Sequence, residues 1–140
     1  MKRKFYKGAG VVLFKKNSDG HSILLGKRTI DPDKNKWSIF GGKSELHDKT
    51  SFETAKREFK EESYMDLDSL DAKLVGSCDF NFVFFKWTTF LYEVDESFPV
   101  PSRFCSEFSE FRFIPLEEIK NYQLGFGVKR EIGMFLKLVQ

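Results

Sequence analysis

Residues 41–62 read GGKSELHDKTSFETAKREFKEE, and this stretch of the 140-residue chain decides its fold. Two glycines come first, a polar loop follows, and a run of helix-favouring residues ends the stretch. A hydroxyl at Thr50 or Ser51 can accept a hydrogen bond from a free amide of the first helical turn. We therefore expect a helix from this point to about Tyr64.

The expected helix has two distinct faces. At about 100° per residue, its apolar side chains share one arc and three glutamates gather beside it. The apolar set is Phe52, Ala55 and Phe59, and the acidic set is Glu58, Glu61 and Glu62. Like charges at this spacing weaken a helix by roughly 0.2–0.5 kcal/mol per pair. Mg²⁺ would offset the repulsion, because it takes oxygen ligands and is commonly completed by substrate phosphates. The acidic face thus predicts a magnesium site for a diphosphate substrate, where the metal would activate water.

Two neighbouring features support this interpretation. Arg57 can reach Glu61 at the i+4 spacing and hold its carboxylate in one orientation. Gly41 and Gly42 let the backbone approach a metal or phosphate, so that a carbonyl could complete the coordination. The alternative is a solvated helix face whose alternating charges only keep the protein soluble. The strand and the double glycine before the helix favour the site.

The whole stretch resembles the Nudix box, whose pattern is Gly, five residues, Glu, seven residues, then Arg-Glu-apolar-x-Glu-Glu-x-Gly-apolar. Gly42 fits the opening glycine, and residues 57–62 fit the second half without change. The resemblance implies a MutT-like Nudix hydrolase with the Nudix-type α/β/α sandwich and a mixed β-sheet. It also implies a set of site residues: metal ligands Gly42, Glu58, Glu61 and Glu62, with Arg57 as their orienting partner and Arg57, Glu58 and Glu61 in catalysis.

The sequence departs from the box at three places. Asp48 stands where the pattern has glutamate, and eight residues instead of seven separate it from Arg57. Tyr64 replaces the glycine after the helix, and Phe40 stands where many members have proline. The loop is expected to hold one extra residue, which leaves the outer coordination shell open.

Further site residues are expected outside the box. The segment from Glu107 to Leu116 resembles a later family segment that often brings another carboxylate to the metal, so Glu110 and Glu107 are candidates for a ligand or a general base. Exposed loop glutamates are an equal alternative. Three basic residues flank the site and could contact phosphate oxygens, although solvation is their commoner fate. They are Arg28, Lys36 and Lys43.

The rest of the chain alternates strand and helix signals, with more strand than helix. We expect strands at Tyr6–Lys16, Ser22–Arg28, Trp37–Phe40, Lys73–Cys78, Phe80–Asp95 and Phe111–Ile114, with a bend or turn near Asn81. A short helix is expected at Leu116–Tyr122, and a terminal helix at Lys129–Val139 with Ile132, Phe135, Leu136 and Val139 facing the core. Phe80, Phe82, Phe84, Phe85 and Phe90 are expected mainly in the core, with stacking on a base as the alternative.

Composition excludes several classes of protein. The chain is 41% apolar and 31% charged with a net charge of +2, which is typical of one soluble domain over residues 1–140 and predicts no nucleic-acid binding. No run approaches the roughly 20 apolar residues of a membrane span, and no signal peptide is recognised. Cys78 and Cys105 are expected to be reduced thiols. We expect a cytoplasmic protein, with a homodimer left open.

These observations predict a hydrolase that uses Mg²⁺, or Mn²⁺ as a substitute, to cleave a nucleotide-like diphosphate. The leading substrate is a nucleoside triphosphate, an oxidised one included, followed by ADP-ribose, nucleotide sugars and dinucleoside polyphosphates. Two alternatives keep the scaffold without this reaction: a non-catalytic ligand-binding module and an isomerase. The complete Arg-Glu-x-x-Glu-Glu run argues against both.

Overall fold

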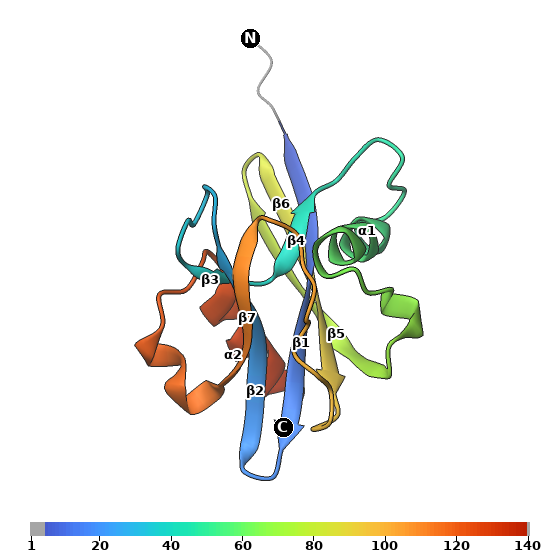
Figure 1. The fold of residues 1–140 in the computed structure, drawn as a ribbon. Helices are drawn as coiled ribbons and strands as arrows, with labels where there is room; N and C mark the ends of the chain where they lie inside the picture. The colour runs from blue at the N-terminus through green and yellow to red at the C-terminus, as the bar shows by residue number, and fades with distance from the viewer. Residues whose placement is uncertain (1–4, 140) are drawn as a thin grey trace.

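The computed structural model describes residues 5–139 and shows strands and helices in mixed order (Figure 1). The strands are β1 (Tyr6–Asn17), β2 (Gly20–Arg28), β3 (Trp37–Ser38), β4 (Phe40–Lys43), β5 (Ala72–Phe82), β6 (Phe85–Val94) and β7 (Phe108–Pro115). The α-helices are α1 (Ser51–Ser63) and α2 (Val128–Leu138), and two short 3₁₀ helices are η1 (Leu67–Ser69) and η2 (Leu116–Asn121).

The strands form one mixed sheet, as the sequence predicts. Its order is β3-β2-β1-β6-β5, with β4 paired to β1 and β7 paired to β2. β1 and β2 form the expected antiparallel hairpin, whereas β1 runs parallel to β6, which comes about 70 residues later. A parallel neighbour requires a crossover connection, and the segment containing β4 and α1 supplies it.

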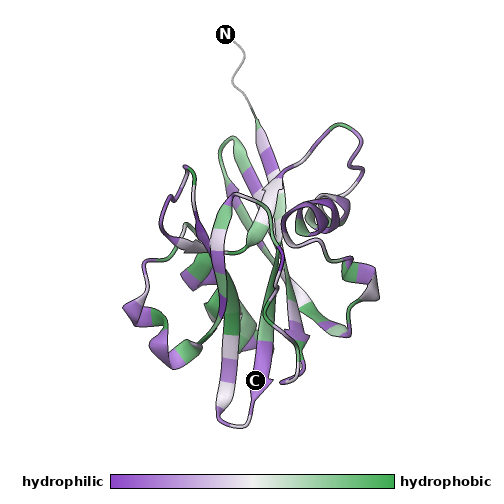
Figure 2. Cartoon of the chain, in the orientation of Figure 1, coloured by the Kyte–Doolittle hydropathy of each residue, from purple (hydrophilic) through white to green (hydrophobic). Residues whose placement is uncertain are grey.

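Side-chain alternation along β1 builds a core on each face of the sheet. Ala9, Val11 and Leu13 pack in the cluster that holds Ala55 and Phe59 of α1. Val12 and Phe14 point the other way, into the cluster that holds Val128, Ile132 and Phe135 of α2. Because successive side chains of a strand face opposite ways, one apolar strand can serve both layers. The result is the predicted α/β/α sandwich, and Figure 2 shows hydrophobic stretches along the strands.

The boundaries of several elements differ from the sequence-based prediction. The turn expected near Asn81 lies two residues later, at Val83 and Phe84, and joins β5 to β6. Val83 adopts a φ of 42°, which a β-branched residue rarely does. The predicted strand Trp37–Phe40 is divided, because β3 pairs with β2 while β4 pairs with β1. The short helix after Pro115 is a 3₁₀ helix.

The core-facing side of α2 was predicted incorrectly at one position. Leu136 is exposed, while Val128 and Glu131 lie on the buried side together with Ile132 and Phe135. A carboxylate therefore occupies a place in an otherwise apolar helix face. Elsewhere, Cys78 and Cys105 are free thiols, as expected. No helix within residues 5–139 is long and apolar enough to cross a bilayer.

Candidate functional site

The N-terminus of α1 is fixed by a reciprocal pair of capping bonds. Thr50 Oγ1 accepts a hydrogen bond from the Glu53 amide at 3.1 Å, and Glu53 Oε2 accepts one from the Lys49 amide at 2.6 Å. The apolar face then buries Phe59, whose ring packs edge-on against Phe40 of β4. Capping and packing together set the rotation of the helix, so that its acidic face meets the end of β4.

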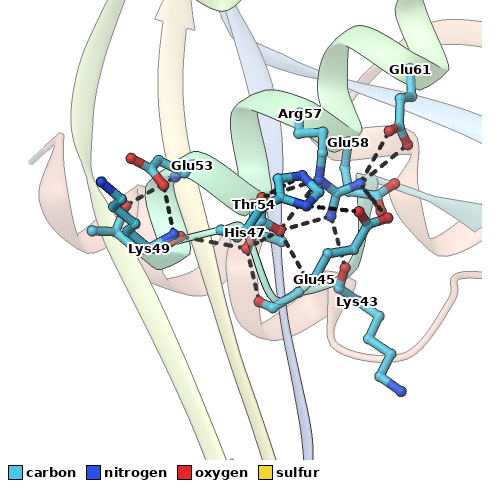
Figure 3. Close-up of polar contacts among 12 residues, drawn as sticks. Lys43, Glu45, His47, Lys49, Glu53, Thr54, Arg57, Glu58 and Glu61 are labelled. Carbon is cyan, nitrogen blue, oxygen red and sulfur yellow. Dashed lines mark hydrogen bonds and ion pairs between the residues drawn. The ribbon is translucent and has the colours of Figure 1, made fainter.

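Arg57 is the hub of the polar contacts at this end of the molecule (Figure 3). It donates to Asp48 through Nη2 at 2.9 Å and to the Lys43 carbonyl at 3.0 Å. It also donates to Glu58 and Glu61, each at 3.2 Å, which confirms the expected i+4 contact. Arg57 therefore ties the loop to the acidic face of α1.

Asp48 anchors this hub from the loop. Its side chain is only 3% exposed, and the bonded Arg57 guanidinium holds the pKa of the carboxyl well below its usual range. Thr54 and the Glu45 amide donate to the same carboxylate. Asp48 has a shorter side chain than the glutamate of the Nudix box, and its loop has one extra residue. Its carboxylate nevertheless bonds to Arg57.

Gly42 allows the Glu58 carboxylate to lie directly against the backbone. A Cβ built on Gly42 would stand 2.4 Å from the carboxyl carbon of Glu58, closer than any real contact. Burial raises the pKa of the half-buried Glu58, the nearby Arg57 opposes the shift, and Glu61 adds to it. Only glycine leaves room here for the carboxylate.

Glu62 is the most buried carboxylate of the box. It is 3% exposed and accepts a hydrogen bond from the Gly41 amide at 2.7 Å. Burial raises its pKa to about 9, with further contributions from Glu58 and Glu107. One oxygen of Glu62, one of Glu107 and the Cys105 sulfur all lie within 4.8 Å of one another. Glu107 thereby joins the carboxylates of α1 from the loop before β7.

This cluster of acids fits a divalent cation. Glu58 and Glu107 raise the pKa of Glu62, and a buried carboxylate without a cationic partner must otherwise hold a proton. The donors are mainly carboxylate oxygens, the ligands that Mg²⁺ and Mn²⁺ prefer. The residues that would hold the ion are Glu58, Glu62 and Glu107, with the Gly42 carbonyl as the predicted backbone ligand.

Two predicted site residues lie apart from this cluster. Glu61 is 56% exposed and is held by Arg57 on the solvent side of Glu58. Glu110 pairs with Arg112 on β7 and does not line the cavity described below. The structure therefore does not support Glu110 as the further carboxylate. Glu110 lies within β7, where the alternation of side chains along the strand fixes the face to which it points. Glu107 precedes the strand, and its carboxylate lies beside that of Glu62.

A cavity of about 1070 Å³ extends from these carboxylates across the sheet toward α2. Glu58, Gly42 and Glu107 line one end, where the predicted phosphate contacts Arg28 and Lys43 are also found. Lys36 does not line the cavity and pairs with Asp33 at 3.8 Å. The remaining wall is largely aromatic: Tyr6, Phe80, Phe82, Phe85, Trp87 and Phe126. Of the phenylalanines singled out in the sequence, Phe90 packs instead in the core on the α1 face.

One part of the cavity wall was not predicted from the sequence. It is formed by Trp87, Thr89, Arg130 and Glu131 from β6 and α2. Glu131 carried a signal that could have been used, since an acid at a core-facing position of an apolar helix face is unusual. Trp87 carried none, because its exposure to a cavity depends on the strand pairing of β6 with β1.

Comparison with known proteins agrees with this arrangement. The family model described as NUDIX domain matches residues 4–133. No curated protein matches the sequence. Members of this family use divalent metal ions, in keeping with the acidic cluster.

Several solved structures share the fold. The NUDIX domain of Shewanella oneidensis NrtR, complexed with ADP ribose, is 17% identical, with a TM-score of 0.73 over 100% of this chain and 91% of that one. A C. elegans Ap4A hydrolase is 19% identical, with a TM-score of 0.67 over 94% and 98%. A bifunctional NMN adenylyltransferase/ADP ribose pyrophosphatase from Francisella tularensis is 19% identical, with a TM-score of 0.79 over 98% of this chain but only 42% of that protein.

Proposed function

This chain belongs to the Nudix family and is a hydrolase of acid anhydrides. We propose that it is a magnesium-dependent pyrophosphohydrolase whose substrate is a nucleoside diphosphate linked to another group. The observation that carries the proposal is the position of the acidic cluster at one end of a large aromatic cavity. Charged phosphates would lie at the cluster, and the apolar part of the ligand would fill the rest of the cavity.

The charges around the cluster support a diphosphate. Arg28 and Lys43 line the same end of the cavity as Glu58 and Glu107. Arginine and lysine are the usual side chains that contact phosphate oxygens. A cation held by the acids would neutralise further phosphate charge, and when bound it lowers the pKa of a water that attacks phosphorus.

The residues of the chain have separable parts in this proposal. Glu58, Glu62 and Glu107 bind the cation, and Glu107 is also our candidate for the general base that accepts the proton of the attacking water. Arg57 orients Glu58 and Glu61, because it bonds to both carboxylates while being held by Asp48. Glu61 shares the contact with Arg57, and its negative charge raises the pKa of Glu58.

A nucleoside triphosphate is the leading substrate, an oxidised one included, because it combines a diphosphate with a planar base. ADP-ribose is the second candidate. Two proteins of similar fold are a NUDIX domain complexed with ADP ribose and a bifunctional NMN adenylyltransferase/ADP ribose pyrophosphatase. The cavity of about 1070 Å³ reaches the upper end of the usual range for ligand sites. Nucleotide sugars and dinucleoside polyphosphates complete the set.

The test is phosphate or nucleotide release from this panel of substrates with Mg²⁺, with Mn²⁺ and with a chelator. We expect metal-dependent cleavage of one class. Glu58→Gln should lower turnover by orders of magnitude with little change in melting temperature, because it removes the charge of a proposed cation ligand at nearly constant volume. The matched control is Glu118→Gln, an exposed acid on η2, which should keep wild-type turnover.

Two results would overturn the proposal. Wild-type turnover in Glu58→Gln would show that the acidic cluster does not carry the reaction. Silence across the whole panel, with ligand binding retained, would favour a non-catalytic binding module on the same scaffold.

A further inference from the structure

The floor of the cavity near α2 is a tryptophan that rests on glycines. A Cβ on Gly8 would stand 2.7 Å from the Trp87 ring, and a Cβ on Gly41 would stand 2.8 Å from it. Gly10 leaves a similar space, with the ring 3.0 Å away. The three residues belong to the paired strands β1 and β4. Missing side chains on two strands therefore make the space in which this indole lies, and the ring lines the cavity.

A directed chain of hydrogen bonds leads from this indole to a buried acid. Trp87 Nε1 donates to Thr89 Oγ1 at 2.8 Å, and Thr89 Oγ1 bonds to Glu131 Oε2. An indole nitrogen can only donate, and a hydroxyl has a single proton to give. The Thr89 hydroxyl can therefore donate its one proton to Glu131 Oε2 when the acid is ionised.

The other oxygen of Glu131 is left for a ligand. Within the described part of the chain, Oε1 forms no hydrogen bond, although Glu131 is only 6% exposed. Every completely buried polar side-chain atom there has a partner, so Oε1 is not sealed in the core. Since Glu131 lines the cavity, this oxygen opens into it. Burial raises the pKa of Glu131 to about 7.

We propose that this part of the cavity is a nucleobase subsite, in which a base lies against Trp87 and Glu131 Oε1 bonds to a polar group on its edge. The proposal rests on the proposed function and deepens it. A nucleobase has apolar faces and a hydrogen-bonding edge, which match an exposed indole and a lone carboxyl oxygen. A second phosphate group does not match, because the neighbouring cation is engaged: Arg130 bonds to the Asp79 carbonyl and lies over the Phe80 ring.

Because the Trp87 ring lies against Gly41, next to Gly42, the base and the diphosphate would occupy adjoining parts of the cavity. The acidic cluster on α1 would take the diphosphate, and the subsite between β6 and α2 would take the base. Glu131 would distinguish bases by the hydrogen-bonding groups on their edges. A base whose edge lacks a matching group would leave the buried Glu131 oxygen unpaired.

The experiment measures binding of nucleosides, which carry no phosphate, in a chelator. The chain has two tryptophans, so its ¹H–¹⁵N spectrum should contain two indole N–H signals, and Trp87→Phe assigns one of them. Adenosine, guanosine, cytidine, uridine and free ribose are titrated separately. We expect at least one nucleoside, but not ribose, to shift the Trp87 signal in a saturable way.

Two variants test the role of the acid. Glu131→Gln should weaken the affinity for the preferred nucleoside about tenfold or more, the size of effect expected when a buried hydrogen bond is mismatched. Thr89→Val should weaken it too, because Glu131 loses the donor that fixes its orientation. Glu118 does not line the cavity, so Glu118→Gln should bind like the wild type. The spectrum itself shows whether each variant is folded.

The inference is overturned if no nucleoside shifts the Trp87 signal, if ribose shifts it equally, or if both variants bind every nucleoside like the wild type. Its failure is separable from that of the proposed function. Nucleoside binding that depends on Glu131, without cleavage of any diphosphate, would support the subsite and reject the hydrolase activity proposed here. Cleavage of a diphosphate with unchanged KM in Glu131→Gln would support the hydrolase activity and reject the subsite.

Discussion

At the scale of single residues, the site depends on what Gly42 lacks. The Glu58 carboxylate occupies the position that any side chain at residue 42 would fill. This makes the glycine a steric requirement for the placement of a proposed metal ligand, in addition to its expected role as a carbonyl ligand. The contact involves the end of a flexible side chain, so a larger residue would displace Glu58 before it disturbed the strand.

Gly42→Ala should therefore lower metal-dependent turnover by about 10- to 100-fold, the usual cost of disturbing the surroundings of a metal ligand, with a melting temperature close to that of the wild type. Turnover is measured against Mg²⁺ concentration. The matched control is Gly133→Ala, since a Cβ there meets no atom within 4 Å. This exposed helix position should gain roughly 0.5–1 kcal/mol of stability and keep its activity. Equal turnover in the two variants would contradict the steric argument.

The sequence predicted the residues of the box better than their neighbours. Arg57 with Glu61 was predictable because i+4 spacing on a helix fixes a distance. The choice between Glu107 and Glu110 was not, since it depends on where β7 begins and on which face each residue lies. Glu131 was missed because its proposed role depends on a cavity that β1 to β6 and both α-helices line together.

At the scale of elements, the end of α1 shows how this chain manages without the usual glycine of the box. Tyr64 adopts φ 60° and ψ 20°, a left-handed conformation, and its amide donates to the Lys60 carbonyl. Glycine is the common residue at this place, because a Cβ is strained there. The helix therefore ends where the pattern predicts, with strain at Tyr64 partly offset by the Arg103 guanidinium 5.4 Å from its ring.

Tyr64→Gly should be more stable than Tyr64→Ala by about 1 kcal/mol, because both variants lose the ring and only glycine removes the strained Cβ. The difference in melting temperature should be roughly 2–5 °C for a chain of this size. Urea unfolding of the two variants measures it directly. Equal stability would mean that the backbone at residue 64 relaxes without cost.

The elements whose signals are local were predicted well, and those that depend on pairing were not. Thr50 caps α1 as expected because a hydroxyl before a helix acts within one turn. The β5–β6 turn was misplaced because Val83 and Phe84 carry no turn signal, and strand pairing imposes the positive φ on Val83. The division of Trp37–Phe40 between two partners likewise follows from the sheet order.

At the scale of the whole molecule, the fold brings buried acids together at a cost to its own stability. Glu62 is ionised in the unfolded chain at neutral pH, but its pKa in the folded protein is raised to about 9 by burial. The folded state therefore holds a proton that the unfolded state has lost. Stability should fall as pH rises from about 4.5, the model value of a glutamate, to about 9, with a slope of at most roughly 1.4 kcal/mol per unit of pH.

The pH dependence of metal-free unfolding tests this linkage. Glu131 contributes in the same direction up to its pKa of about 7, so the interval from pH 7 to 9 reports mainly on Glu62. In urea unfolding with a chelator, Glu62→Gln should flatten the decline in this interval, because glutamine keeps the bond from the Gly41 amide and never ionises. Mg²⁺ should stabilise the wild type more at pH 8 than at pH 6, since it binds the ionised carboxylates, and should do less for Glu62→Gln. The control Glu118→Gln should follow the wild type. Parallel curves for Glu62→Gln and the wild type would show that Glu62 is already ionised without metal, and that the acidic cluster is stabilised by other means.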